Sequence, residues 1–130
     1  MLSDHQVYAA IPTADMEALR PFYEGVLGFV PREANPAGIY YDAGGGTYFV
    51  LTRSSGKASG SHTQMAFRVT DIESEVRDLK AKGVAFEVYE DMPGVAWDGE
   101  IATIPGMGRA AWFRDSENNI LCVDQEPARS

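Results

Sequence analysis

The hydrophobic and polar positions of the first half of the chain predict a strand, a helix and a hairpin. Residues 6–12 alternate as in a half-buried strand, and residues 13–29 carry apolar side chains at helical spacing. Residues 38–53 contain two apolar strands around a triple glycine, which is typical of a hairpin turn. Residues 54–61 are small or polar with a single lysine, and therefore indicate a flexible linker.

The same order returns after the linker. Residues 63–69 predict a strand, residues 70–84 a helix and residues 86–90 a further strand. Residues 91–108 are dense in glycine and proline and are expected to form a long loop. Residues 109–125 predict a second hairpin, so the order of elements repeats.

The helix boundaries make this repeat quantitative. Asp15 and Asp71 are expected to cap the two helices, with a nearby preceding threonine as the alternative in each case, and they lie 56 positions apart. Gly28 and Gly83 are expected to end the helices and lie 55 apart. Pro21 falls inside the first helical pattern, so that helix is expected to kink or to restart there.

The closing hairpins repeat at a larger spacing. Asp42 matches Asp115 and Phe49 matches Cys122, both 73 positions apart. Compared with the spacing of the helix ends, the second half has gained about 18 residues, which we assign to its long loop. The chain is therefore expected to contain two copies of a strand, helix and three-strand unit.

The chain is expected to form one soluble domain. It has 130 residues, and no apolar run reaches the length of a membrane helix. The single cysteine, Cys122, fits a reducing compartment, and the first residues lack the pattern of a secretory signal. We therefore expect a cytoplasmic protein.

The charge balance disfavours polyanionic partners. Nineteen acidic residues against eleven basic ones give a net charge of −8, which repels nucleic acid and anionic membranes. The same balance favours a cationic small molecule, or serves only as a device for solubility.

Three stretches resemble the vicinal oxygen chelate superfamily, which includes glyoxalases, bleomycin-resistance proteins and extradiol dioxygenases. They are "IPTADMEALRPFYEGVLGF", "HTQMAFRVTDIESEVRDLKAKGVAFE" and "AAWFRDSENNIL", and the resemblance extends from Val7 to Gln125. In the last stretch Ser116 and Asn118 replace the proline and glycine of the family's turn, and asparagine tolerates the positive φ that such a turn requires.

The resemblance implies an α+β fold of two tandem βαβββ modules whose curled mixed sheets form a cleft. The whole chain, residues 1–130, is then one domain. Its first module covers about 5–53, its linker about 54–61 and its second module about 62–126.

The family's metal-ligand positions lack suitable donors here. Carried over by the spacings above, these positions are Tyr8, Phe49, Gln64 and Cys122. A catalytic divalent metal needs several imidazole or carboxylate ligands, and this set contains neither. We therefore expect no metal and no cofactor. His62 either binds a ligand or a metal at the cleft rim or is an exposed residue where the strand begins beside the linker.

Four polar positions are candidates for ligand contacts. Tyr8 and Gln64 alternate away from the apolar face of their strands, so they hydrogen-bond a ligand or each other. Arg68 shares the face of Gln64 and pairs with an anionic group or forms a structural salt bridge. Cys122 is either a buried inert thiol or a reactive one.

Four aromatic residues complete the candidate set. Tyr40, Phe49, Trp97 and Trp112 come from hairpin strands or from the long loop, and aromatic linings are usual in small-molecule sites. Core packing is the alternative for Phe49 and Trp112. Trp97 is a lid over a ligand, an anchor for its loop or part of a subunit interface.

Three functions remain open. The first is a metal-independent protein that binds an aromatic or cationic small molecule, as the bleomycin-resistance branch does. The second is a lyase, isomerase or dioxygenase with a relocated metal or a tyrosine acid or base. The third is an interaction domain whose cleft is filled by its own side chains. The family commonly forms homodimers, which we expect here, although the linker also suits a monomer.

Overall fold

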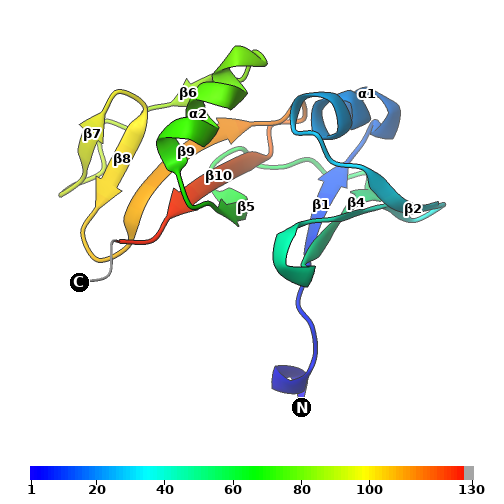
Figure 1. Cartoon of the computed structure of the whole chain (residues 1–130). Coiled ribbons are helices and arrows are strands. Elements are labelled where there is room, and N and C mark those ends of the chain that lie inside the picture. Colours follow the sequence, from blue (N-terminus) through cyan, green and yellow to red (C-terminus); the bar gives the residue numbers. More distant parts are fainter. Residues whose placement is uncertain (128–130) are drawn as a thin grey trace. The chain divides into compact units, whose positions relative to one another are not determined.

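The computed structural model describes residues 1–127 and divides the chain into two compact units, Met1–Ser59 and Gly60–Ser130 (Figure 1). Each unit has a mixed β-sheet with helical segments, so the fold belongs to the α+β class. All strand pairs of each sheet come from its own unit.

The first unit has the expected strand, helix and hairpin. Its elements are η1 (Leu2–Asp4), β1 (Ala9–Thr13), α1 (Met16–Pro21), the π-helical turn η2 (Phe22–Val26), β2 (Pro31–Asn35), β3 (Gly38–Asp42), the 3-10 turn η3 (Gly44–Gly46) and β4 (Tyr48–Arg53). The sheet order is β1-β4-β3-β2, with β1 parallel to β4 and the other pairs antiparallel. The break expected at Pro21 is confirmed, because α1 ends there and continues as η2. The sequence pattern does not locate β2.

One face of this sheet packs against α1 and η2 to form the core of the unit. Phe49 lies at its centre, with ring centroids 5.3 Å from Tyr41, 5.7 Å from Tyr23 and 5.0 Å from Phe29. Leu19, Tyr23 and Tyr41 are fully buried, as expected for alternate strand residues facing an amphipathic helix.

The second unit contains more strands than the sequence pattern predicts. Its elements are β5 (Thr63–Arg68), α2 (Ile72–Ala81), β6 (Phe86–Glu87), β7 (Ala96–Asp98), β8 (Ile101–Ile104), β9 (Gly108–Arg114) and β10 (Ile120–Gln125). The sheet order is β5-β10-β9-β8-β7, and β6 pairs with β9. The loop expected over residues 91–108 is wrong in part, since it contains the hairpin β7–β8, and the strand expected over 86–90 shrinks to β6.

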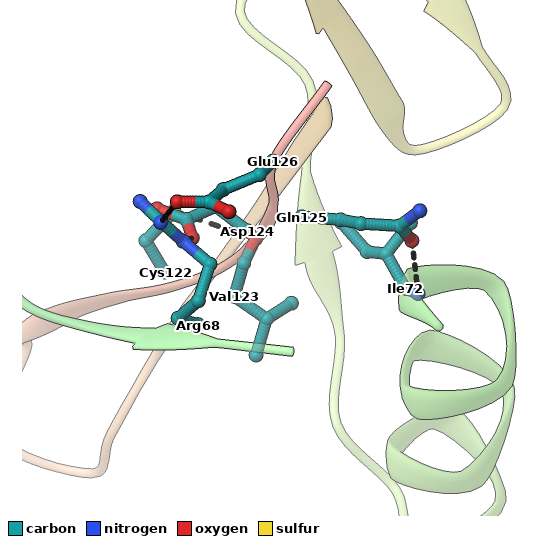
Figure 2. A network of polar contacts seen from close by, with 7 residues as sticks. All are labelled: Arg68, Ile72, Cys122, Val123, Asp124, Gln125 and Glu126. Atoms are coloured by element: carbon teal, nitrogen blue, oxygen red, sulfur yellow. Dashed lines mark hydrogen bonds and ion pairs between the residues drawn. The ribbon is translucent and has the colours of Figure 1, made fainter. Parts of the chain in front are cut away.

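The core of the second unit lies between α2 and the β9–β10 hairpin. Ile72 and Val76 of α2 are buried, as are Leu121 and Phe113, which lie opposite each other in β10 and β9. Gln125 accepts a hydrogen bond from the backbone nitrogen of Ile72 at 2.9 Å and so joins the start of α2 to the end of β10 (Figure 2).

The order β1-β4-β3 of the first sheet recurs as β5-β10-β9 in the second, with a correction to the expected spacing. Asp42 lies opposite Tyr48 in the first hairpin and Arg114 opposite Ile120 in the second, so matching positions are 72 residues apart rather than 73. Consequently Leu121 matches Phe49, and Val50 matches Cys122. The inserted residues form the β7–β8 hairpin at the edge of the second sheet.

Backbone conformation confirms three turn assignments. Gly28 (φ 83°) and Gly83 (φ 94°) follow the two helical regions in the left-handed region. Asn118 has φ 70° and is the one non-glycine residue with a positive φ among residues 1–127. Asparagine therefore serves where the family's turn carries glycine.

No helix within residues 1–127 combines the length and apolar character needed to cross a bilayer.

Candidate functional site

The second sheet is hollowed on the face that points away from α2. Leu121, Val123 and Gln125 point toward the helix side, so the alternate residues Cys122 and Asp124 point to the other face. There they border an open cavity of about 960 Å³, here called the sheet hollow. Its volume lies in the range of sites for drug-sized molecules.

The floor of the sheet hollow is apolar and is formed mainly by small side chains. Cys122 of β10 lies between Ala66 of β5 and Trp112 of β9, and Ala110 lies opposite Asp124. All of these residues line the hollow. The two alanines and the buried thiol leave the space that larger side chains would fill.

Trp112 forms an aromatic wall and is held on several sides. Its indole nitrogen donates a hydrogen bond to the Thr63 hydroxyl at 3.2 Å. The Tyr89 ring meets it edge-on at 5.6 Å, and the Trp97 ring lies tilted at 6.0 Å. These contacts fix the indole plane, which favours stacking of a flat ligand with little loss of side-chain freedom.

Arg68 supplies the charged side of the hollow together with two carboxylates (Figure 2). Its Nε donates to Asp124 Oδ1 at 2.5 Å and its Nη1 donates to Glu126 Oε1 at 2.5 Å. The bond to Asp124 raises the pKa of Arg68 above its ordinary value, so the group stays cationic.

Cys122 stays a thiol at ordinary pH. Burial, reinforced by the negative charge of Asp124, raises the pKa of Cys122 to about 12. A protonated thiol is a poor nucleophile and a poor metal ligand. The geometry therefore favours the buried, inert form of this residue.

The residues at the family's metal positions do not fit a catalytic metal. With the corrected spacing these positions are Tyr8, Val50, Gln64 and Cys122, and valine offers no donor atom. In the described part of the chain, no three His, Cys, Asp or Glu side chains gather closely enough to hold a metal ion. Phenol and amide groups are weak ligands for a divalent cation, and one thiol alone does not hold a catalytic metal.

A second depression of about 400 Å³ lies beside the sheet hollow and shares Trp112 and Thr63 with it. His62, Tyr89 and Arg114 also line this depression. Arg114 donates to Glu87 at 2.6 Å, and this bond is the main cause that lowers the pKa of Glu87.

Tyr89 also donates to Glu87, at 2.6 Å. Burial and this bond raise the pKa of Tyr89 to about 12, so the phenol that supports Trp112 is neutral.

The first unit carries an aromatic surface on the face of its sheet that points away from its own core. Tyr8 stacks on Tyr48 at 4.9 Å between ring centroids, and Tyr40 lies 6.4 Å from Tyr8. The guanidinium of Arg32 lies 4.8 Å from the centroid of Tyr48 and pairs with Asp42 at 3.0 Å. Tyr48 and Tyr40, whose centroid lies 5.5 Å from the same guanidinium, therefore already hold one cation over their faces.

Three of the expected site residues line the sheet hollow, and a fourth adjoins them. Arg68, Trp112 and Cys122 meet in the sheet hollow, and Trp97 lies next to Trp112. Trp97 belongs to strand β7 and not to a loop, because it pairs with Ala102 of β8.

The other four candidates are not on the lining of the sheet hollow. Tyr8 and Tyr40 belong to the tyrosine surface of the first unit, whereas Phe49 is 2% exposed and lies in the core of that unit. Gln64 is half-buried at a bulge in β5, where the pairing shifts between Thr63 and Met65. Among residues 1–127, the lining of the hollow includes the neighbouring Thr63 but not Gln64.

Sequence reasoning missed several residues of these surfaces. Tyr48 directly precedes Phe49 in β4. Matching the two hairpins at a spacing of 72 residues instead of 73 would have placed Tyr48, and not Phe49, on the same face of the sheet as Tyr40. Tyr89 lies in the expected strand 86–90 without a motif to mark it. Asp124 and Glu126 alternate with Cys122, and that alternation is the signal that could have found them.

Comparison with known proteins identifies the family. The sequence profile of the glyoxalase/bleomycin resistance protein/dioxygenase superfamily matches residues 5–123, and the chain therefore belongs to this superfamily. Comparison with curated proteins gives no match.

Solved structures of this fold are similar over nearly the whole chain. TnmS3, an antibiotic binding protein from Streptomyces sp. CB03234, is 23% identical, with 95% of this chain and 96% of that chain covered and a TM-score of 0.67. FosX, a genomically encoded fosfomycin resistance protein from Listeria monocytogenes, is 12% identical, with 95% and 93% covered and a TM-score of 0.68. At these identities the likeness establishes the fold.

Proposed function

We propose that the protein is a metal-independent binder that holds an aromatic or cationic small molecule in the sheet hollow. The observation that carries this proposal is the hollow itself, an open space of about 960 Å³ with an apolar floor, one fixed indole wall and a charged rim. A few polar groups around a mainly apolar lining are usual in small-molecule sites.

The lining suggests the chemistry of the ligand. Trp112 offers a flat apolar face with a hydrogen-bonded edge, which suits an aromatic ring system. Asp124 and Glu126 outnumber Arg68 on the rim, and the chain carries a net charge of −8. Both favour a cationic ligand over an anionic one.

Metal independence rests on the donor set. Val50 and the protonated Cys122 take the positions where the family places ligands on the last strands, and Tyr8 and Gln64 take those on the first strands. TnmS3, an antibiotic binding protein, shares the fold, and small-molecule binding is the function that we transfer from it as part of this proposal.

Fluorescence titration tests the proposal with thioflavin T, a cationic aromatic dye, as the probe. We expect saturable binding that is lost in W112L and kept in F22L. Phe22 is a half-buried aromatic residue on η2 of the first unit and serves as the matched control. Equal binding by W112L would contradict the assignment to the sheet hollow.

EDTA treatment and added metal ions test whether binding is independent of metal. The dissociation constant should not change after EDTA treatment or on addition of Zn²⁺, Ni²⁺, Mn²⁺ or Fe²⁺. A large saturable rise in melting temperature with any one of these ions would contradict metal independence.

We also propose that Tyr8 and Tyr40 contact a ligand on the aromatic surface that they form with Tyr48 in the first unit.

We further propose that the protein forms a homodimer. The outer strands β1 and β2 leave edges that a second copy can pair with, which supports a dimer. Sedimentation equilibrium tests the stoichiometry, and a monomer at micromolar concentration would contradict it.

A further inference from the structure

The ion pairs of the sheet hollow have an unusual arrangement, because one arginine bridges two carboxylates that all face the same space. Arg68 ends β5 and lies directly opposite Asp124 of β10, while Glu126 follows two residues later on the same face. The guanidinium uses its Nε for Asp124 and its Nη1 for Glu126 (Figure 2). It therefore occupies the position that a ligand cation would take between these carboxylates.

The charges of the hollow do not cancel. Arg109, the other cation on the lining, bonds Glu73 of α2 at 2.8 Å and is neutralised there. Arg68 then faces two carboxylates alone, so the rim keeps one negative charge in excess. If Arg68 turned away, a second negative charge would be uncovered.

The guanidinium of Arg68 can move out of its two ion pairs without disturbing the sheet. The Arg68 side chain is 58% exposed, while its partners Glu126 and Asp124 are 54% and 26% exposed, and ion pairs of an exposed arginine contribute little to stability. The strand pairing of β5 with β10 is made by the backbone and does not depend on the guanidinium. The arginine stem is long and flexible, so its head group reaches solvent with few lost contacts.

We propose that Arg68 is a displaceable internal cation, and that the ligand's own cationic group replaces it between Asp124 and Glu126 while the ligand's aromatic body stacks on Trp112. This inference rests on the proposed binding function and specifies its ligand class as aromatic cations. Arg68 then sets the affinity by competing with the ligand for the same two carboxylates.

The competition predicts opposite effects of Arg68 on cationic and anionic ligands. An anionic ligand would need Arg68 in place, and its approach is opposed by both carboxylates. A cationic ligand gains when Arg68 is removed, because the two carboxylates then have no internal partner. Removal of Arg68 should therefore strengthen cation binding, and removal of the carboxylates should weaken it.

Titrations of two dyes measure this effect: thioflavin T, a cation, and 1-anilinonaphthalene-8-sulfonate, an anion. We expect R68Q to bind thioflavin T about tenfold more tightly than the unmodified protein, and E126Q and D124N/E126Q to bind it about tenfold more weakly. The sulfonate dye should bind more weakly than thioflavin T in the unmodified protein.

The matched control is R32Q. Arg32 pairs with Asp42 in the first unit, is 43% exposed and is not on the lining of the hollow, so this variant changes the net charge by the same amount at a residue outside the proposed site. We expect its affinity for thioflavin T to change by less than about twofold. Circular dichroism and melting temperature confirm folding, and E126Q alone keeps the test valid if the double variant does not fold.

Each result bears on a particular claim. Unchanged or weaker thioflavin T binding by R68Q overturns the displacement of Arg68, as does equal tightening in R32Q. If W112L abolishes dye binding but none of the charge variants alters it, the binding function stands and this inference fails. If the unmodified protein binds neither dye, the proposed function fails with it.

Discussion

Asp15 and Asp71 cap the two helical regions in matching conformations, 56 residues apart. Asp15 has φ −137° and ψ 89°, and its side chain accepts a hydrogen bond from the backbone nitrogen of Ala18 at 3.2 Å. Asp71 has φ −141° and ψ 90° and accepts from the backbone nitrogen of Ser74 at 3.2 Å. Of the caps considered from the sequence, the structure therefore selects the two aspartates.

Replacement of either cap should destabilise the protein by a similar amount. We expect D15A and D71A each to lower the free energy of unfolding by about 1 kcal/mol, because each leaves a backbone N–H at a helix start without its partner. Urea denaturation measures the change. D15N and D71N keep an accepting oxygen and should lose less than half as much, and equal losses in the alanine and asparagine variants would contradict the capping role.

Gly108 should not tolerate a side chain. It has φ 102° where β9 begins, and a Cβ there would lie 2.1 Å from the backbone oxygen of Gln125. We expect G108A to lower the free energy of unfolding by more than about 2 kcal/mol, because a left-handed backbone strains alanine and the added Cβ clashes with backbone atoms rather than with a flexible side chain.

Gly44 provides the control for that change. It has no positive φ, and among the described residues nothing lies within 4 Å of an added Cβ. Thermal or urea denaturation of G44A should show a change below about 0.5 kcal/mol. A G108A protein as stable as G44A would mean that the backbone at Gly108 adapts freely.

Glu24 should make stability depend on pH in the acid range. The bond from Arg20 at 2.7 Å, assisted by the Tyr41 hydroxyl at 2.7 Å, lowers the pKa of Glu24 below its ordinary value of 4.5. A lowered carboxyl pKa stabilises the fold above the ordinary pKa, and the contribution is lost as pH falls through the folded value.

The variant E24Q measures this contribution. We expect it to be less stable than the unmodified protein by about 1 kcal/mol at pH 7, with the difference shrinking toward pH 3 as Glu24 becomes protonated. Urea denaturation across that range gives the profile. A difference that stays constant with pH would exclude an electrostatic origin.

Cys122 should be unreactive in the folded protein. With its pKa raised to about 12 by burial, about one thiol in ten thousand is ionised at pH 8. We expect Ellman's reagent to modify the native protein at least a hundredfold more slowly than protein unfolded in guanidinium chloride. The unfolded protein gives the reference rate for a fully accessible thiol. Equal rates would show that the floor of the sheet hollow is open to the reagent.

The elements with strong local signals could be predicted from the sequence. Asp15, Asp71, Gly28 and Gly83 mark the helix ends, and Asn118 takes the positive φ expected of it. Each of these assignments depends on the chemistry of one residue and its neighbours, which a sequence contains in full.

Local sequence signals do not predict the β7–β8 hairpin, nor which residues match between the β3–β4 and β9–β10 hairpins. Pro93, Gly94 and Gly99 suggest a loop, yet β8 gains its backbone partners from β9, a choice made by tertiary structure. The spacing error of one residue placed Phe49 on the wrong face of the sheet, because side chains alternate with a period of two. The ion pairs of Arg68 depend on which strand lies beside β5, which local patterns do not specify.

Each sheet forms its ladder of hydrogen bonds from its own half of the chain, and this pattern has an evolutionary consequence. If an ancestral half-length gene was duplicated and fused, each copy brought a complete set of strand partners. The second copy could then acquire the β7–β8 hairpin at the free edge of its sheet without altering any pairing in the first. Later insertions are expected at the same edge, where a new strand adds to the sheet and displaces none.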